Sequence, residues 1–411
     1  MSERAEILFI CGVFAKENET EVIGWSKKSV EFSANQMQLK LIEGLKKEAH
    51  TQVVSAPFIG HYPNQSKCIY FKNFRNRQNI CDYVSFNNIW GIKNLSRANA
   101  IKKRIHDFIN LRDCKKLIIV FSAHDPFLSA AVYAKKCDPS IKVCFVVPDL
   151  PQYMNLETGK KPIYNFLKKY DIKSIKKHMR CVDSSVVLTS YMAKELELDQ
   201  KPYIIEEGVI DILPEKSKYE SIGDEKEHST INIVYAGKLY FRFGMQQLIE
   251  AFSKIDDENY RLILCGNGDA VCFINKTAEK DKRIILTGQI SPDEVKEYIK
   301  KADVLINPRP NNEEYTKYSF PSKDIEYLLS GHAVAAYMLD GMPKCYKDFI
   351  YEIQSGAYDA NEIKSAIMRA AAASEEEKRE KYLKFIEYAS KNLLATEIAK
   401  KIIKMNFGQE E

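Results

Sequence analysis

The sequence predicts an α/β protein with two doubly wound parallel sheets. Short apolar runs of strand length alternate with amphipathic segments almost throughout the chain. A polar stretch of weak periodicity, residues 206–230, interrupts this alternation near the middle. The length of 411 residues is too great for one ordinary core and suits two domains of roughly 200 residues each. We therefore expect two Rossmann-like domains that face each other across a cleft.

In the first half, apolar runs separated by helix-length segments mark the strands. They predict strands at Ile7–Cys11, Thr51–Ala56, Lys116–Ser122, Ile141–Val147 and Ser185–Thr189. Residues 68–88 are richer in Tyr, Phe and Asn and less regular, which favours edge strands and loops. We place this first domain at residues 1–208.

In the second half the alternation is cleaner. It predicts strands at Ile231–Ala236, Tyr260–Cys265, Arg283–Thr287, Asp303–Asn307 and Ala333–Tyr337. Ser291 and Glu294 form a capping-box pattern with proline between them, which predicts the start of a helix. From Asn361 onward the pattern is helical only. We expect the second domain at residues 209–385 and a terminal helical segment, residues 386–411, that packs back on the first domain.

Composition excludes several classes of protein. Hydrophobic residues make up 45% and charged residues 28%, which is typical of a soluble globular chain. The sequence contains neither an apolar run near the ~20 residues that cross a bilayer nor a basic and apolar leader. The ten cysteines are scattered and form no Cys-x-x-Cys pair, so we expect reduced thiols in a cytosolic protein and no zinc site. The net charge of +5 mildly favours an anionic partner.

One segment of the second half has the pattern of a phosphate-binding helix start. Pro321-Ser322-Lys323 ends a polar loop, and a short apolar-striped helix follows, with Gly331 placed to end it. Free N–H groups at such a start attract phosphate, and Lys323 adds a full positive charge. Glu326 lies one turn further along the face of Ser322, where a carboxylate can accept hydrogen bonds from both hydroxyls of a ribose. The alternative is an ordinary amphipathic helix with solvated charges.

This segment, together with the Asn307-Pro308-Arg309 strand end and the Glu326-Tyr327-Leu328 run, resembles the donor-site motif of family-4 retaining glycosyltransferases of the GT-B fold. The resemblance is to the subgroup that builds bacterial capsular polysaccharide, exopolysaccharide or O-antigen. It implies an N-terminal acceptor domain, a C-terminal donor domain, and final helices that cross back to the first domain. It also implies retention of anomeric configuration without a covalent intermediate.

Further residues of the second half match the expected donor site. Gly237 and Lys238 follow a strand, and Lys238 is the expected contact of the donor diphosphate. The second basic residue of the family is replaced by Phe243, so we assign that role to Arg242. The Gly-x-Gly turn at Gly266 and Asn267 suits backbone contact with the donor or is simply a tight turn.

Arg309 ends a strand, and we expect it either to face the cleft or to pair with Glu313 or Glu314. The wider family often has a glutamate eight residues before Glu326, where this chain has Tyr318. The resemblance therefore leaves open whether an acidic residue touches the transferred sugar. Glu313 and Glu314 are the candidate substitutes in the loop, and both are equally well explained as solvated charges.

In the first half, His124 follows an apolar strand, and the resemblance places it beside the donor sugar and phosphate. A histidine that only completes a strand end is the alternative. We expect His124 and Lys238 to be the catalytic residues. Gly12, after the opening strand, and Asp149, in a Val-Pro-Asp-Leu-Pro-Gln segment, are expected on the acceptor side.

Residues 160–180 read as a basic amphipathic helix, with eight Lys or Arg against Asp171 alone. Such a helix suits the surface of an anionic membrane, at ~1 kcal/mol per cation near the surface. A solvated helix face is the plain alternative. Nucleic acid fits poorly because neither an aromatic platform nor a recognition motif accompanies the charge. We expect a cytoplasmic protein, with contact to the inner face of the plasma membrane as the further option.

Taken together, these patterns predict a retaining glycosyltransferase. It would move a hexose-type sugar from a nucleotide-diphosphate donor to a lipid-linked or oligosaccharide acceptor in surface polysaccharide synthesis. The expected donor is a UDP-sugar. The expected enzyme needs no metal or other cofactor, because the sequence has no Asp-x-Asp motif after a strand. A sugar-nucleotide epimerase or hydrolase of the same fold, and a non-catalytic nucleotide-sugar-binding protein, are the alternatives.

Overall fold

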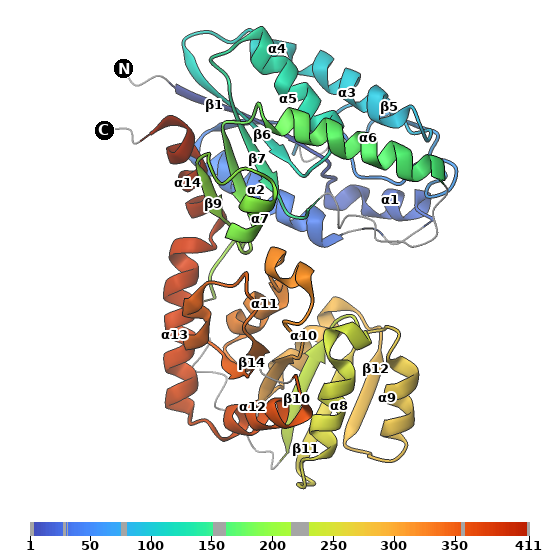
Figure 1. Cartoon of the computed structure of the whole chain (residues 1–411), viewed down its shortest axis with the longest axis vertical. Coiled ribbons are helices and arrows are strands. Elements are labelled where there is room, and N and C mark those ends of the chain that lie inside the picture. Colours follow the sequence, from blue (N-terminus) through green and yellow to red (C-terminus); the bar gives the residue numbers. More distant parts are fainter. Residues whose placement is uncertain are drawn as a thin grey trace. The chain divides into compact units, whose positions relative to one another are not determined.

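The computed structural model describes residues 4–27, 30, 32–74, 80–150, 162–214, 230–354 and 358–408. The chain splits into two compact units (Figure 1): unit 1 is Met1–Asp211 with Asn392–Glu411, and unit 2 is Ile212–Lys391. Each unit contains one parallel sheet with helices packed on it. The predicted α/β class with two Rossmann-like units is therefore confirmed.

The main sheet of unit 1 has seven strands in the order β4-β2-β1-β6-β7-β8-β9. Their bounds are β1 Arg4–Cys11, β2 His50–Ser55, β4 Asp82–Tyr83, β6 Cys114–Phe121, β7 Lys142–Val147, β8 Ser184–Val187 and β9 Tyr203–Ile205. Helices cover both faces, so the central strands are buried on both sides and appear in the sequence as continuous apolar runs. The five predicted strands are present, whereas the short β9 has no such run and was not predicted.

Two short strands, β3 Tyr70–Phe71 and β5 Phe86–Asn87, pair antiparallel beside this sheet. They lie in the Tyr- and Phe-rich stretch expected to hold edge strands. Phe71 and Phe86 stack with ring centroids 5.2 Å apart, and both rings are buried. The aromatic residues of this stretch therefore form a small core of their own.

The helices of unit 1 form two layers around its sheet (Figure 1). One layer contains α3 Lys93–Arg104, α4 His106–Ile109, α5 Asp125–Cys137 and α6 Pro162–Met179. The other contains α1 Glu19–Trp25, α2 Phe32–Glu48 and α14 Ala395–Phe407, while the short α7 Ser190–Glu195 follows β8. Gly44 of α2 lies against the backbone of Ala395, where a Cβ would overlap that residue. Close packing of α14 on α2 thus depends on a glycine.

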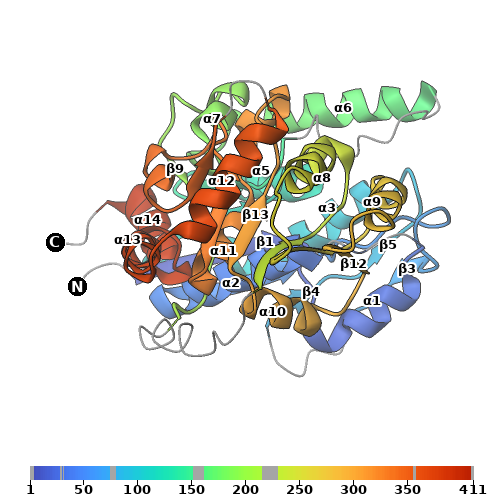
Figure 2. The same cartoon turned by 90° about the horizontal axis from the view of Figure 1, so that it is seen from below.

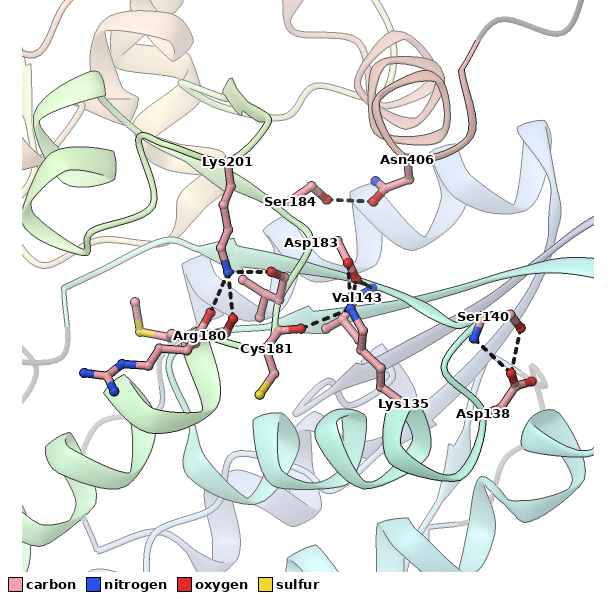
Figure 3. Close-up of polar contacts among 12 residues, drawn as sticks. Lys135, Asp138, Ser140, Val143, Arg180, Cys181, Asp183, Ser184, Lys201 and Asn406 are labelled. Atoms are coloured by element: carbon pink, nitrogen blue, oxygen red, sulfur yellow. Dashed lines mark hydrogen bonds and ion pairs between the residues drawn. The ribbon is translucent and has the colours of Figure 1, made fainter.

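The end of the chain is attached to unit 1 by backbone and side-chain hydrogen bonds. Ile210 and the Leu393–Ala395 segment exchange two backbone hydrogen bonds of 2.9 Å. Figure 3 shows Ser184, which lies at the start of β8. The Ser184 hydroxyl donates to Asn406 Oδ1 of α14 at 2.8 Å. In the same view, Lys201 donates to main-chain carbonyls, including that of Val182 at 2.7 Å. The contacts of Ser184 and Ile210 hold the end of the chain on unit 1, at the start of β8 and in the segment that follows β9.

The sheet of unit 2 has six parallel strands in the order β12-β11-β10-β13-β14-β15. Their bounds are β10 Ile231–Ala236, β11 Tyr260–Cys265, β12 Ile284–Gly288, β13 Val304–Asn307, β14 Ala333–Tyr337 and β15 Tyr351–Ile353. All five predicted strands are present, and β15 is an additional edge strand. Pairing of β10 with both β11 and β13 places it at the centre.

The helices of unit 2 are α8 Met245–Ser253, α9 Val271–Ala278, α10 Pro292–Lys300, α11 Ser322–Ser330, α12 Ala360–Ala372 and α13 Glu375–Asn392. Figure 2 shows α8 and α12 side by side. The predicted capping box is present, since the Ser291 hydroxyl accepts from the Glu294 N–H while the Glu294 carboxylate accepts from the Ser291 N–H.

The divisions of the structure differ by a few residues from the expected domain limits. The first falls after Asp211 rather than after residue 208, and part of the expected linker, residues 215–229, lies outside the described residues. The expected terminal segment begins at residue 386, which lies inside α13. The segment that belongs to unit 1 begins at Asn392, where α13 ends.

Candidate functional site

The strand order of unit 2 reverses direction between β10 and β13. The chain moves outward from β10 to β11 and β12, then returns to β13 on the other side of β10. In open parallel sheets, the loops that leave two such strands diverge at the carboxyl edge, and ligands bind there. Gly237 and Lys238 follow β10, and Arg309 follows β13 and leads toward α11. The expected donor residues are therefore brought to one edge of the sheet.

The loops after β10 and β11 approach each other through their glycines. The Gly237 N–H donates to the Cys265 carbonyl at 2.7 Å, and a Cβ on Gly266 would overlap the Gly237 carbonyl. Gly266 has φ +148°, a conformation that favours glycine. Asn267 is exposed, and its side chain accepts from the N–H of Gly268 at 2.8 Å. Gly266 and Asn267 thus form the tight turn that sequence reasoning left as one of two interpretations.

Lys323 lies against the end of β10. Its half-buried ammonium donates to the Ala236 carbonyl and lies 4.9 Å from the centroid of the Tyr235 ring. It also fills the space beside Gly237, where a Cβ would overlap Nζ. Burial lowers the pKa of Lys323 to about 8, although the carboxylates of Glu326 and Asp324 oppose this shift. Lys238, by contrast, is exposed at the same strand end.

The start of α11 is open to a ligand. Its N-cap residue is Pro321, which has no side-chain oxygen that could accept from the first N–H groups, and no side-chain cap is present. Ser322 is exposed, and Glu326 is exposed one turn further along. The helix ends as predicted at Gly331, which has the left-handed φ of +88°. The uncapped helix start and the exposed Glu326 are therefore compatible with the expected phosphate and ribose contacts.

Asp324 lies at the candidate site and was missed by sequence reasoning. Its carboxyl group is buried and accepts from Asn307 Nδ2 at 2.6 Å, which holds the first turn of α11 on the end of β13. Burial raises its pKa to about 7, against the hydrogen bond from Asn307 and the charges of Arg309 and Lys323. The sequence signal that could have identified Asp324 is its place on the apolar face of α11, beside Ile325 and Leu328.

Arg309 is held by aromatic rings and a hydroxyl. Its Nη2 donates to Ser319 Oγ at 2.9 Å, and its guanidinium lies 5.7 Å from the Phe243 ring and 5.3 Å from the Tyr315 ring. Of the two alternatives for Arg309, the pair with Glu313 or Glu314 is not formed among the described residues. Glu314 instead pairs with Lys317 at 3.2 Å, and both glutamates are exposed.

Arg242 projects into solvent near the same loop. Its guanidinium lies 5.4 Å from the Tyr240 ring and 5.1 Å from the Phe243 ring. The Phe243 ring therefore contacts both Arg242 and Arg309. Phe243 stands at the position where the resembling enzymes have a basic residue. Tyr318, which replaces the usual acid, is buried at 8% exposure and cannot supply a carboxylate.

Unit 1 has a corresponding reversal of strand order between β1 and β6. Gly12 follows β1 and His124 follows β6, so the fold brings both to the carboxyl edge. The Gly12 N–H donates to Gln38 Oε1 at 3.1 Å, and a Cβ on Gly12 would overlap the Phe58 ring. Phe58 in turn packs edge-on against the His124 ring, with centroids 5.7 Å apart.

His124 is half-buried at the N-cap of α5 and is held by a residue that sequence reasoning missed. Arg97 Nη1 lies 2.6 Å from His124 Nε2. Burial, together with the charges of Arg97 and Lys93, keeps the pKa of His124 well below its usual value. Arg97 belongs to a helix rich in Lys and Arg, so its sequence context indicated only another solvated cation.

The expected acceptor-side and membrane features are described in part. Asp149 is exposed after β7, while residues 151–154 of its segment lie outside the described residues. In the basic helix, residues 160 and 161 and the side chains of 162–169 are likewise outside. In the remainder, Lys173, Lys176, Lys177 and Arg180 are exposed, and Ile175 and Met179 are buried against the unit. In the described part of the chain, every helix is too short or too polar to cross a membrane.

Comparison with known proteins agrees with this geometry. Residues 230–372 match the family model of the glycosyl transferases group 1. The lipopolysaccharide outer core galactosyltransferase WaaB, in its apo form, is similar over 98% of this chain and 99% of its own, at 10% identity and a TM-score of 0.61.

Anabaena HepE is similar in two solved complexes. The complex with UDP matches over 97% of this chain and 98% of its own at 11% identity and a TM-score of 0.61. The complex with UDP-glucose matches over the same shares at 12% identity and a TM-score of 0.56. A search of curated protein sequences yields no match. The chain thus has the GT-B fold, and its residues 230–372 match the model of the glycosyl transferases group 1.

Proposed function

We propose that this protein is a retaining glycosyltransferase of family 4, in the surface-polysaccharide subgroup, which takes a hexose-type sugar from a nucleotide-diphosphate donor. The observation that carries the proposal is the meeting of the Gly237–Lys238 loop with the uncapped start of α11 through Lys323. Free N–H groups, a half-buried ammonium and an exposed ammonium converge there at the switch point of the sheet. Such an arrangement suits a pyrophosphate.

The chemistry follows from the charge that develops on the donor. Breaking the bond between the anomeric carbon and the diphosphate oxygen leaves an oxocarbenium-like sugar and adds negative charge to the departing diphosphate. Preorganised donors aimed at such charge lower barriers by ~2.7–4 kcal/mol each in other enzymes. Lys238 and the first N–H groups of α11 supply this stabilisation, and Glu326 holds the ribose. Retention by front-side attack follows from the family resemblance.

The donor, acceptor and location are further parts of the proposal. The solved complexes of HepE with UDP and with UDP-glucose support a UDP-sugar as the donor. A lipid-linked saccharide is the proposed acceptor, because the exposed cations of α6 suit an anionic membrane surface on the cytoplasmic side. Asp149 and Gly12 are assigned to the acceptor side. We propose that turnover needs no metal, so excess EDTA should leave the rate of UDP release unchanged.

Donor binding is tested by thermal stabilisation with a panel of nucleotide-sugars. A donor at 100 times its dissociation constant should add ~2.7 kcal/mol to the free energy of unfolding. Lys276→Ala is a matched control, because Lys276 is an exposed lysine near the end of α9. It should bind the donor as the wild type does. Absence of stabilisation by every nucleotide-sugar would contradict the proposed site.

Product analysis separates transfer from the two alternatives. A transferase releases nucleoside diphosphate when a lipid-linked or oligosaccharide acceptor is added. Release with water alone would favour a hydrolase, and binding without turnover would favour a binding protein. The anomeric configuration of the product, measured by NMR, tests retention.

A further inference from the structure

We infer that Arg97 is the positioning residue of His124 and holds its imidazole in the tautomer that carries the proton on Nδ1. Arg97 Nη1 lies 2.6 Å from His124 Nε2. A guanidinium offers only donors, so Nε2 must accept this hydrogen bond. In the neutral ring the proton then resides on Nδ1. The inference deepens the proposed function, and it rests on that function only for the identity of the ligand that Nδ1 meets.

Arg97 is itself fixed in place from several sides. It is 1% exposed, and its Nη2 donates to the main-chain carbonyls of Ala56 and Pro57. The guanidinium lies 4.9 Å from the centroid of Phe86 and 5.6 Å from those of Phe58 and Phe127. Because carbonyls and rings surround it, Nη1 has little freedom to leave Nε2. The loop after β2 and the helix α3 therefore determine the orientation of a side chain that follows β6.

The charges around His124 favour the neutral ring. Arg97 contacts the ring from α3, and the charge of Lys93 on the same helix also opposes protonation of the ring. The Lys93 side chain itself donates to the Ile59 carbonyl. The carboxylate next to it in the chain, Asp125, accepts from His178 Nδ1 or pairs with it at 2.9 Å. Arg97 is thus the cation in direct contact with the ring, while the neighbouring carboxylate is engaged by another imidazole. A proton added to Nε2 would also remove the acceptor of Arg97.

The opposite nitrogen of the ring, Nδ1, has no acceptor among the described residues, and His124 is only half-buried. Its Nδ1–H is therefore a neutral, oriented donor at the carboxyl edge of β6. Its natural partner is an oxygen acceptor of a ligand, either a hydroxyl or a phosphate oxygen. If a carboxylate held the ring in place of Arg97, the imidazole would instead be protonated and would present a positive charge to the ligand.

The tautomer is measured by NMR of protein labelled with ¹⁵N-histidine, without donor or acceptor. The signals lost in His124→Asn identify the ring. We expect Nδ1 to show the protonated and Nε2 the unprotonated nitrogen shift at pH 7, with both unchanged down to about pH 5.5, one unit below the usual histidine pKa. A proton on Nε2, or titration of this ring near pH 6.5, would overturn the inference. The wild-type protein is sufficient for this test.

Variants separate positioning from a merely structural role. Arg97→Met should raise the titration midpoint of His124 toward about 6.5 and mix its tautomers, while Arg97→Lys should largely preserve the wild-type signals. Arg104→Met removes an exposed arginine of the same helix and should have no effect on the ring. Unchanged His124 signals in folded Arg97→Met would refute the assignment. If Arg97→Met does not fold, the wild-type tautomer and Arg97→Lys still decide the question. Because these readings need no ligand, they are independent of any failure of the proposed transferase activity.

Discussion

The contact of Lys323 with the end of β10 predicts a defined loss of donor affinity in Lys323→Ala. The Lys323 ammonium is held at the Ala236 carbonyl, beside the start of α11, so it needs little rearrangement to reach a bound diphosphate. A hydrogen bond between charged groups contributes ~1.5–3 kcal/mol. Each 1.4 kcal/mol changes a dissociation constant tenfold, so loss of this hydrogen bond should weaken UDP binding by roughly 10- to 150-fold.

The effect of Lys323→Ala on the free energy of unfolding should be smaller than its effect on donor binding. In Lys323→Ala the Ala236 carbonyl still lies 3.4 Å from the Tyr327 hydroxyl, and the buried methylenes of one lysine are lost. We expect a change of ~1 kcal/mol in the free energy of unfolding, the usual contribution of one hydrogen bond. Donor binding and stability therefore respond differently, and both can be measured on the same sample by calorimetric titration and urea denaturation.

The lowered pKa of Lys323 adds a dependence on pH. The pKa is about 8 in the free protein, so the ammonium loses its proton as the pH rises through 8. Affinity for UDP should fall between about pH 8 and the usual lysine value near 10.4, because binding then requires uptake of a proton. This decline should be absent in Lys323→Ala and present in Lys276→Ala. Equal dissociation constants for the wild type and Lys323→Ala at pH 7 would refute the assignment of the phosphate site.

Three further predictions follow from the same geometry. Glu326→Gln should weaken UDP binding by roughly 10-fold, as expected for loss of a charged acceptor, yet leave pyrophosphate binding unchanged; equal losses for both ligands would contradict the ribose role. Gly266→Ala should cost ~1–3 kcal/mol in urea denaturation, because its Cβ would overlap the Gly237 carbonyl, whereas Gly24→Ala, which has open space, should not destabilise. The lowered pKa of His124 means that the unfolded chain binds its proton first, so the free energy of unfolding should fall below pH 6.5, by as much as ~1.4 kcal/mol at pH 5.5. His124→Asn should lack this part of the pH dependence, and an identical pH profile for that variant would show that the ring titrates normally.

Local patterns in the sequence were sufficient for most of the fold. Continuous apolar runs marked the buried parallel strands such as β1 and β10, and the capping residues Ser291 and Gly331 marked helix ends, because these signals act over a few neighbouring residues. The short strands β9 and β15 were missed. They lie at sheet edges, where only three residues pair and no long apolar run is required.

The sequence by itself indicated the candidate phosphate site at the start of α11, since Pro321, Ser322, Lys323 and Glu326 are neighbours in the chain. Only the tertiary structure decided that Lys323 meets the end of β10, that Asp324 holds Asn307, and that Arg97 holds His124. These pairs are 17 to 87 residues apart in the sequence. Their contacts arise from the order of strands in a sheet, and neither residue of such a pair indicates its partner by its neighbours alone.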